Sequence, residues 1–227
     1  MDESIDIAEE EGFEIKGYCE PFCGMLGVFR YVPELFEDAG LFRLKYKARD
    51  TNDSVIQMWK AAVDGWCPPT KCTKREYENL KKSEASPVRG YIGHQYSFGG
   101  QFFKGYAPLY GKSPVSTAAS NRVQKIAEKV RGVEFSTGDY NNFSRLNNYV
   151  IYCDPPYSDT ENRYAKKFDS EKFWDWCRKM STNNIVFVSE YKAPKDIESI
   201  FQSSHRLTGD LKLRTEDKRR TERLYVL

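Results

Sequence analysis

The clearest strand signal in this chain is Tyr149-Val-Ile-Tyr-Cys-Asp154-Pro-Pro-Tyr157. Five apolar or aromatic residues in a row are typical of a strand that is buried on both faces, as strands of parallel sheets are. Two prolines follow almost at once, and proline does not continue a central strand because it has no N–H to donate. The stretch therefore predicts a buried parallel strand over 149–153 and a rigid loop at its carboxyl end.

On both sides of this strand, short apolar runs alternate with helical patterns, which favours an α/β fold with a mostly parallel sheet. Strands are expected over 15–19, 43–49, 133–135 and 184–189, with return strands in 205–227. Helices are expected over 55–63, over 121–131 and from Ser170, as the N-cap, to Met180. Residues 66–120 show little periodicity and are interpreted as an insertion. The expected organisation is an acidic leader (1–16), a main domain (17–65 and 121–227) and the insertion (66–120).

The net charge of +2 hides two parts of opposite sign. Residues 1–14 contain seven acidic side chains and no basic one, so the remaining residues carry +9. A basic body favours a polyanionic partner, and the first residues are expected to form a solvated tail.

Several classes of protein are disfavoured by the sequence. No apolar run approaches the ~20 residues that span a bilayer, and the acidic N-terminus is unlike a signal peptide. The six cysteines form no Cys-x-x-Cys pair, and each lies in an apolar or aromatic setting, so we expect no metal site and a reducing, intracellular compartment.

The loop Asp154-Pro155-Pro156-Tyr157 combines a carboxylate, a rigid backbone and an aromatic ring. Ligands of open α/β sheets bind at the carboxyl ends of the strands. There, Asp154 and the Pro155 carbonyl can accept from the two N–H groups of an exocyclic amine while Tyr157 stacks on the base, which turns the nitrogen lone pair toward an electrophile. The alternative, a strand that ends in a proline turn with a surface Asp, has about equal weight for this tetrapeptide alone.

A second motif, Glu20-Pro-Phe-Cys-Gly24-Met-Leu-Gly27, follows the expected first strand. Glycine at such a turn lets a ligand approach the backbone closely. The motif is neither G-x-G-x-x-G nor a P-loop, and an ordinary turn with a C-cap glycine accounts for it equally well.

Taken together, these motifs resemble the Dam-like (D12 class) DNA N6-adenine methyltransferases. The best matches are Tyr18-Cys-Glu-Pro-Phe-Cys-Gly24 and Tyr152-Cys-Asp-Pro-Pro-Tyr157, in family order and at a family-like separation. Other stretches, among them Tyr96-Ser-Phe-Gly-Gly-Gln-Phe-Phe-Lys-Gly-Tyr106, look like the phage and large-virus members. The resemblance covers residues 17–227.

The resemblance implies a class I methyltransferase fold, which is a Rossmann-like α/β sheet, and the cofactor S-adenosylmethionine. It implies a site-specific enzyme that methylates a flipped adenine in duplex DNA. The catalytic residues would be Asp154, Pro155, Pro156 and Tyr157. The cofactor-binding residues would be Glu20, Pro21, Phe22, Gly24, Asp50, Asp139 and Tyr140, of which Asp50 would accept from the ribose hydroxyls. As alternatives, Asp50 is interpreted as the cap of the next helix and Asp139 as a turn residue.

The insertion is the expected DNA-reading part, because basic side chains there alternate with aromatic ones. Basic residues near the C-terminus form a second cluster. The residues expected to contact DNA are Tyr96, Phe98, Lys104, Lys112, Arg219 and Arg220. A charge run is also usual on a solvated face, and some of these aromatics must belong to the core.

The chain departs from the family at its N-terminus, where members usually carry a Gly/Lys motif that helps to hold the cofactor. Here the residues ahead of Glu20 are acidic and contain no such motif. Two alternatives therefore stay open: an RNA adenine methyltransferase, and a degenerate methyltransferase fold that acts as a nucleic-acid-binding or scaffolding partner. The family context also suggests a cognate restriction endonuclease, a homodimer or partner chain, and a cytoplasmic location (host cytoplasm or nucleus for a viral member).

Overall fold

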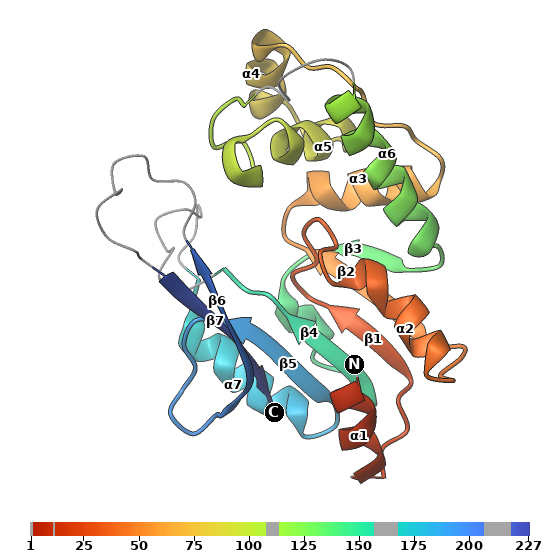
Figure 1. The fold of residues 1–227 in the computed structure, drawn as a ribbon, viewed down its shortest axis with the longest axis vertical. Helices are drawn as coiled ribbons and strands as arrows, with labels where there is room; N and C mark the ends of the chain where they lie inside the picture. Colours follow the sequence, from red (N-terminus) through yellow and green to blue (C-terminus); the bar gives the residue numbers. More distant parts are fainter. Residues whose placement is uncertain (1, 11, 108–113, 157–167, 207–218) are drawn as a thin grey trace. The chain divides into compact units, whose positions relative to one another are not determined.

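The computed structural model describes residues 2–10, 12–107, 114–156, 168–206 and 219–227. Its helices are α1 (Asp2–Glu10), α2 (Val32–Asp38), α3 (Asp53–Val63), α4 (Lys74–Lys82), α5 (Pro87–Gln95), α6 (Pro114–Lys129) and α7 (Ser170–Ser181), with 3-10 turns η1 (Phe29–Tyr31), η2 (Phe98–Gly100) and η3 (Tyr140–Phe143). Its strands are β1 (Gly17–Glu20), β2 (Lys45–Asp50), β3 (Glu134–Thr137), β4 (Tyr149–Cys153), β5 (Ile185–Glu190), β6 (Ser199–Arg206) and β7 (Arg219–Val226) (Figure 1).

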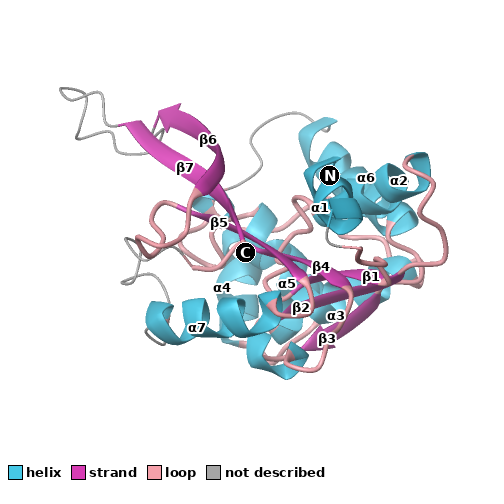
Figure 2. Cartoon of the chain, turned by 90° about the horizontal axis from the view of Figure 1, so that it is seen from below, coloured by secondary structure: helices cyan, strands magenta, loops and turns pink. Residues whose placement is uncertain are grey.

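The strand order is β3-β2-β1-β4-β5-β7-β6. β4 pairs in parallel with both β1 and β5, and β2 pairs in parallel with β3, whereas β7 is antiparallel to both β5 and β6. The antiparallel pair β6 and β7 is seen in Figure 2. The order 3-2-1-4-5 is that of Rossmann-like folds, in which the strand order reverses beside the first strand. The Rossmann-like α/β fold with a mostly parallel sheet, expected from the sequence, is confirmed.

The chain divides into two compact units. The first unit comprises Met1–Phe22, Arg43–Tyr46 and Tyr140–Leu227, and the second comprises Cys23–Phe42 and Lys47–Asp139. The expected insertion (66–120) lies inside the second unit, together with residues that were expected in the main domain. The boundaries of the units therefore differ from those that the change in composition predicts.

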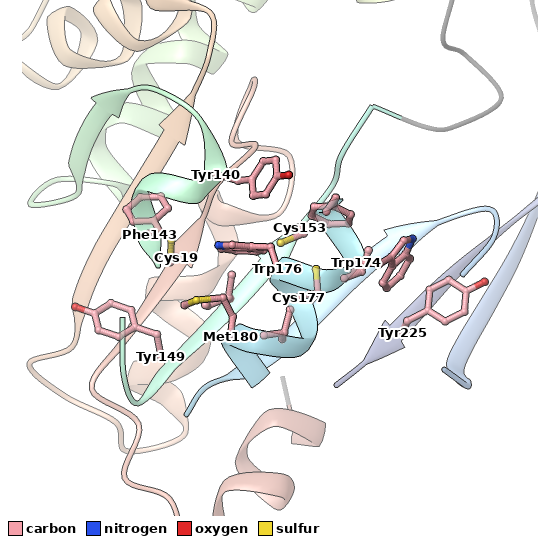
Figure 3. Packing of buried hydrophobic residues seen from close by; sticks show 14 residues of the cluster. Cys19, Tyr140, Phe143, Tyr149, Cys153, Trp174, Trp176, Cys177, Met180 and Tyr225 are labelled. Carbon is pink, nitrogen blue, oxygen red and sulfur yellow. The ribbon is translucent and has the colours of Figure 1, made fainter. Parts of the chain in front are cut away.

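The core of the first unit lies between α7 and one face of the sheet (Figure 3). Phe173, Trp176 and Cys177 of α7 are buried at helical spacing against β4 and β5. The sheet contributes alternate residues, of which Ile151 and Val186 are fully buried. Side chains that alternate with these along β1, β4 and β5 must point to the opposite face.

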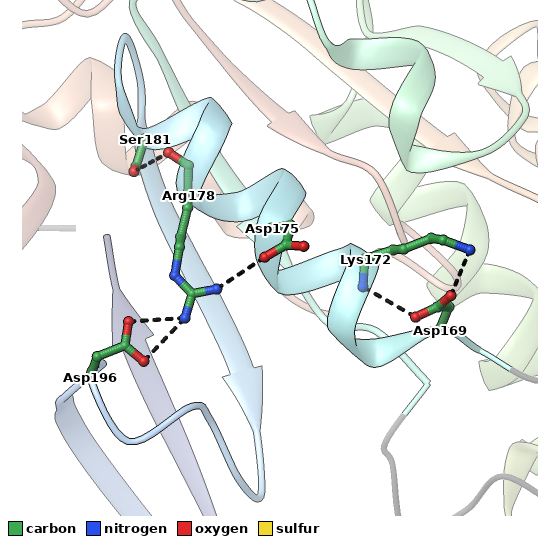
Figure 4. A network of polar contacts seen from close by, with 6 residues as sticks. All are labelled: Asp169, Lys172, Asp175, Arg178, Ser181 and Asp196. Carbon is green, nitrogen blue, oxygen red and sulfur yellow. Dashed lines mark hydrogen bonds and ion pairs between the residues drawn. The ribbon is translucent and has the colours of Figure 1, made fainter.

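Polar contacts fix α7 at both ends (Figure 4). Asp169, rather than the expected Ser170, is the N-cap, and its side chain accepts from the backbone N–H of Lys172 at 3.1 Å. Arg178 donates from one guanidinium nitrogen to both carboxylate oxygens of Asp196, at 2.9 and 3.1 Å. These pairs are exposed and contribute little to stability, so the packing of α7 depends mainly on its apolar face.

The first residues of the chain form a helix rather than the solvated tail that their charge predicts. Ser4 and Ala8 of α1 are buried, because residues four apart share one helical face, and α1 contacts β5. The acidic composition was a misleading guide here, since carboxylates on the outer face of a helix leave its small inner residues free to pack.

The part of the chain with little periodicity also contains helices. α4 begins with a capping box, in which Thr73 and Glu76 satisfy each other's backbone N–H groups. α5 begins with Ser86 as its N-cap and Pro87 as its first residue. α6 begins at Pro114 rather than at Asn121. Local capping therefore specifies these helices where the apolar pattern does not.

Candidate functional site

The carboxyl end of β4 presents the predicted catalytic loop. β4 occupies the predicted residues 149–153, and most of its side chains are buried. Asp154 is exposed, Pro155 is buried and Pro156 is half-buried. Tyr157, the predicted stacking residue, lies outside the described residues. The carboxylate of Asp154 therefore stands at the surface, on a backbone that a buried proline holds in place.

Polar side chains of four strands gather around this loop within the first unit. In the parallel pairs, Cys19 lies opposite Ile151 and Cys153 opposite Val188, and all four belong to the α7 core. Because side chains alternate, the next positions share the opposite face. We name these residues the carboxyl-edge cluster: Glu20, Tyr152, Asp154, Ser189 and Glu222.

Hydrogen bonds order this cluster. The Tyr18 hydroxyl donates to Glu20 Oε1 at 2.7 Å, and Glu20 is almost fully buried. Ser189 Oγ donates to Glu222 Oε1 at 2.5 Å. The sequence motifs identified Glu20 and Asp154. They gave no role to Tyr152, although it begins one of the motifs, nor to Ser189 and Glu222, which come together only through strand register.

The same surroundings keep the phenols of the cluster protonated. Burial raises the pKa of Tyr152, and the negative charge of Asp154 raises it further. Burial and the adjacent Glu20 also raise the pKa of Tyr18 well above its usual range. Neither phenol can therefore act as a base near neutral pH, and both act as hydrogen-bonding groups.

A second group of predicted residues lies in the second unit, where Asp50 ends β2. Asp50 Oδ2 accepts from the Gly24 N–H at 3.0 Å, and Oδ1 accepts from the Asn52 N–H at 2.8 Å. Burial raises the pKa of Asp50, and these hydrogen bonds oppose the shift. Gly24 has a φ of 43°, and a Cβ placed there would meet no atom within 4 Å. The turn is thus open on one side, and the half-buried carboxylate of Asp50 holds it through two backbone N–H groups.

His94 of α5 is a residue near Asp50 that the sequence did not single out. Burial lowers the pKa of His94, and the charge of Asp50 acts in the opposite direction. Its Nδ1 lies 2.7 Å from the Gly100 carbonyl. His94 and Asp50 are far apart in the sequence, so only the packing of α5 against α3 could have shown that they face each other.

Comparisons with known proteins add a distant likeness in fold. No family model and no curated protein matches the chain. The rRNA methyltransferase aviRa from Streptomyces viridochromogenes is 10% identical, with a TM-score of 0.35 over 99% of this chain and 82% of that one. SMU.472, a protein provisionally assigned as a methyltransferase and complexed with SAH, is 11% identical, with a TM-score of 0.35 over 98% of this chain and 50% of that one. Neither likeness bears on the chemistry of this chain.

The remaining residues predicted to bind cofactor lie in different settings. In the first unit, Phe22 packs against Tyr140 with ring centroids 5.6 Å apart, and Tyr140 belongs to the buried α7 core. Pro21 is buried as well. In the second unit, Asp139 is exposed, and its carbonyl accepts from Arg49 at 3.5 Å. The half-buried Phe22 has ring surface for a ligand, whereas Tyr140 serves mainly in packing.

The residues predicted to contact DNA differ in exposure: some lie at the surface and one lies in the core. Phe98 is 68% exposed, and Lys104 is exposed as well. Tyr96 is only 3% exposed and packs against Tyr91, so its prediction is corrected: this ring belongs to the core and has no face for a base. Lys112 lies outside the described residues, and for Arg219 and Arg220 the structure describes the β7 backbone alone.

Arg89, one of the basic residues of the insertion, has a structural role. Its guanidinium donates to Ser54 Oγ at 2.9 Å and to the Leu80 carbonyl at 3.0 Å, and it lies over the Phe102 ring. These contacts join α5 to α3 and α4.

Two kinds of feature are absent from the described parts of the chain. Among those residues, no group of three or more His, Cys, Asp or Glu side chains could hold a metal ion. No helix within them is long and apolar enough to cross a membrane.

Proposed function

We propose that this protein is an S-adenosylmethionine-dependent DNA methyltransferase that modifies adenine at N6. The observation that carries the proposal is the exposed Asp154, followed by a buried proline, at the carboxyl end of a buried parallel strand. Ligands of this fold class bind at that edge. The resemblance of the two motifs to Dam-like enzymes supports the same interpretation.

The residues around Gly24 fit the cofactor. Asp50 accepts from backbone N–H groups of the turn, and a carboxylate has about four lone-pair sites, so acceptor capacity remains for ribose hydroxyls. The open side of the Gly24 turn admits a ligand close to the backbone. In the first unit, considered by itself, the resemblance also assigns Glu20 to the cofactor, and Glu20 is a buried carboxylate. When bound, the cofactor supplies a methyl group on a sulfonium that needs no further activation.

The residues of this chain act on the acceptor amine. The Asp154 carboxylate and the Pro155 carbonyl each accept one N–H of the adenine amino group, which holds its lone pair toward the methyl donor. The two prolines keep both acceptors in fixed directions. Positioning of this kind, rather than acid–base catalysis, is the contribution that we assign to the loop.

The test is transfer of a radiolabelled methyl group from S-adenosylmethionine to unmethylated duplex DNA, with RNA of the same sequence as a second acceptor. We expect label in the DNA as N6-methyladenine. Label found only in RNA would mean that RNA, and not DNA, is the acceptor. No label in either nucleic acid would favour a degenerate methyltransferase fold that binds nucleic acid without acting as an enzyme.

Asp50 gives a test of cofactor binding. Replacing Asp50 with alanine removes the ribose acceptor and two hydrogen bonds of the turn, so we expect S-adenosylmethionine affinity in calorimetry to fall by about 10- to 100-fold. Because burial raises the pKa of Asp50, native affinity should rise with pH as this carboxyl ionises above its usual range. An Asp53→Ala variant, which changes a carboxylate exposed on α3, should bind normally.

Lys104 gives a test of DNA binding. In Lys104→Ala, the loss of one phosphate contact should weaken binding to all DNA sequences alike. It should also reduce the slope of log K against log salt by about 1. The matched control is Lys129→Ala, which removes the same charge from a side chain that is paired with Glu34 at 2.6 Å. Equal salt slopes for Lys104→Ala and Lys129→Ala would show that Lys104 does not contact DNA.

A further inference from the structure

The imidazole of His94 on α5 is held in one tautomer by its surroundings. His94 Nδ1 lies 2.7 Å from the Gly100 carbonyl, and because a carbonyl can only accept, Nδ1 must carry a proton. The ring also packs against Phe102, with centroids 5.1 Å apart. Burial lowers the pKa of His94, so at neutral pH the imidazole is uncharged and its other nitrogen, Nε2, presents a lone pair. His94 therefore offers one fixed hydrogen-bond acceptor.

The face of α5 that carries His94 packs against the start of α3, within the second unit (Figure 1). Gly90 and His94 are four residues apart and so share one face of the helix. A Cβ at Gly90 would overlap the Ser54 carbonyl, so this face lies directly on the first turn of α3. Asp50 ends β2 just ahead of that turn. His94 and Asp50 each shift the pKa of the other, which agrees with this placement.

Asp50 by itself has little acceptor capacity left for a ligand. Its two oxygens offer about four lone-pair sites. The backbone N–H groups of Gly24 and Asn52 take two of them, at 3.0 and 2.8 Å, and the Thr51 N–H also favours the charged carboxylate. A ribose presents two neighbouring hydroxyl donors, so a second acceptor beside Asp50 would serve the hydroxyl that Asp50 does not take. Asp50 and His94 are both half-buried, which leaves each partly open to a ligand.

We propose that His94 is a cofactor-binding residue, whose Nε2 accepts from one ribose hydroxyl of S-adenosylmethionine while Asp50 accepts from the other. The inference rests on the proposed function, because it extends the site that Asp50 provides for the cofactor. Two acceptors on neighbouring elements recognise a pair of adjacent hydroxyls, and a ligand that lacks either hydroxyl leaves one acceptor without a donor. The ribose edge of the site is thus built by α5 as well as by β2.

The test measures the binding of S-adenosylhomocysteine and its 2′-deoxy and 3′-deoxy analogues to the full chain by calorimetry. We expect the native chain to bind each deoxy analogue more weakly than the parent ligand by about fivefold or more, because each lacks one hydrogen bond. In His94→Asn, one of these two penalties should disappear and the other should persist. The asparagine amide can still donate to the Gly100 carbonyl from the position of Nδ1, but it places no atom where Nε2 lies.

A purely structural role of His94 would give a different result. A loosened site weakens all three ligands alike, so the ratios of their affinities would stay unchanged. Gln95→Asn is the matched control, because it places the same residue at the next, half-buried position of α5 and should keep both penalties. Melting temperatures report whether each variant folds. His94→Phe, which keeps a ring against Phe102, carries the same expectation and replaces His94→Asn if that variant fails to fold.

The outcomes separate the role of His94 from the proposed reaction. Two penalties that persist in folded His94→Asn would overturn the proposal, even if the chain methylates DNA. A native chain that binds none of the three ligands, or binds all three equally well, would overturn it too. One penalty that disappears in His94→Asn, in a chain that transfers no methyl group, would uphold the role of His94 and reject the proposed reaction.

Discussion

Asp154→Ala is expected to lower methyl transfer to DNA by about 1000-fold, with S-adenosylmethionine affinity unchanged within about twofold. The carboxylate is exposed at the end of β4 and supports no core packing, so its loss should act on the acceptor amine alone. Removal of one preorganised hydrogen-bonding group at a reacting centre typically costs ~100- to 1000-fold. The measurement is single-turnover transfer of labelled methyl groups, with calorimetry for the cofactor.

Asp154→Asn separates geometry from charge. The amide has nearly the same shape, but it offers a single acceptor oxygen and adds N–H donors that oppose the adenine amine. Its rate should therefore lie between those of the native and alanine forms. Asp175→Ala, which removes an exposed carboxylate from α7, should transfer at the native rate. Native rates in Asp154→Ala would reject the assigned mechanism even if the enzyme methylates DNA.

The largest expected effect on stability belongs to Phe173. Its ring is 1% exposed and lies within 5.7 Å, between centroids, of the Phe22, Tyr140 and Trp174 rings. Replacing a buried phenylalanine with alanine removes its transfer free energy and leaves a cavity, so Phe173→Ala should lower the free energy of unfolding by about 3–5 kcal/mol. Urea unfolding followed by tryptophan fluorescence measures it, because Trp174 and Trp176 lie in the same core.

Phe201→Ala is the matched control for this measurement. Phe201 of β6 is 63% exposed, so the same substitution removes little buried surface and should cost less than about 1 kcal/mol. A similar loss in both variants would mean that the α7 core does not hold the first unit together.

The parts of the fold that the sequence predicts are those with strong local signals. β4 matches its prediction residue for residue, because an unbroken apolar run that ends at two prolines is too short for a helix and suits a buried strand. β2 and α3 follow from alternation and from helical spacing. The sequence analysis did not predict α4 and α5, because their apolar stripes are short and their limits depend on the capping residues Thr73 and Ser86.

The candidate site was predictable where its residues belong to one motif. Asp154 and Glu20 stand beside prolines in recognisable stretches, so their place at strand ends follows from the sequence. Ser189 and Glu222 come together only through the antiparallel pairing of β5 with β7, which no local pattern encodes. The composition of the insertion suggested surface aromatics, but it could not separate the exposed Phe98 from the buried Tyr96.

The position of β7 has a consequence for the order in which the first unit assembles. β7 follows β6 in the chain, yet it lies between β5 and β6, so β6 can join the sheet only through β7. The pairing of β5 with β7 brings Glu222 to Ser189, so the carboxyl-edge cluster is complete only once β7 has joined the sheet. The addition of β6 has to follow that step, because among the described strands β6 pairs with β7 alone.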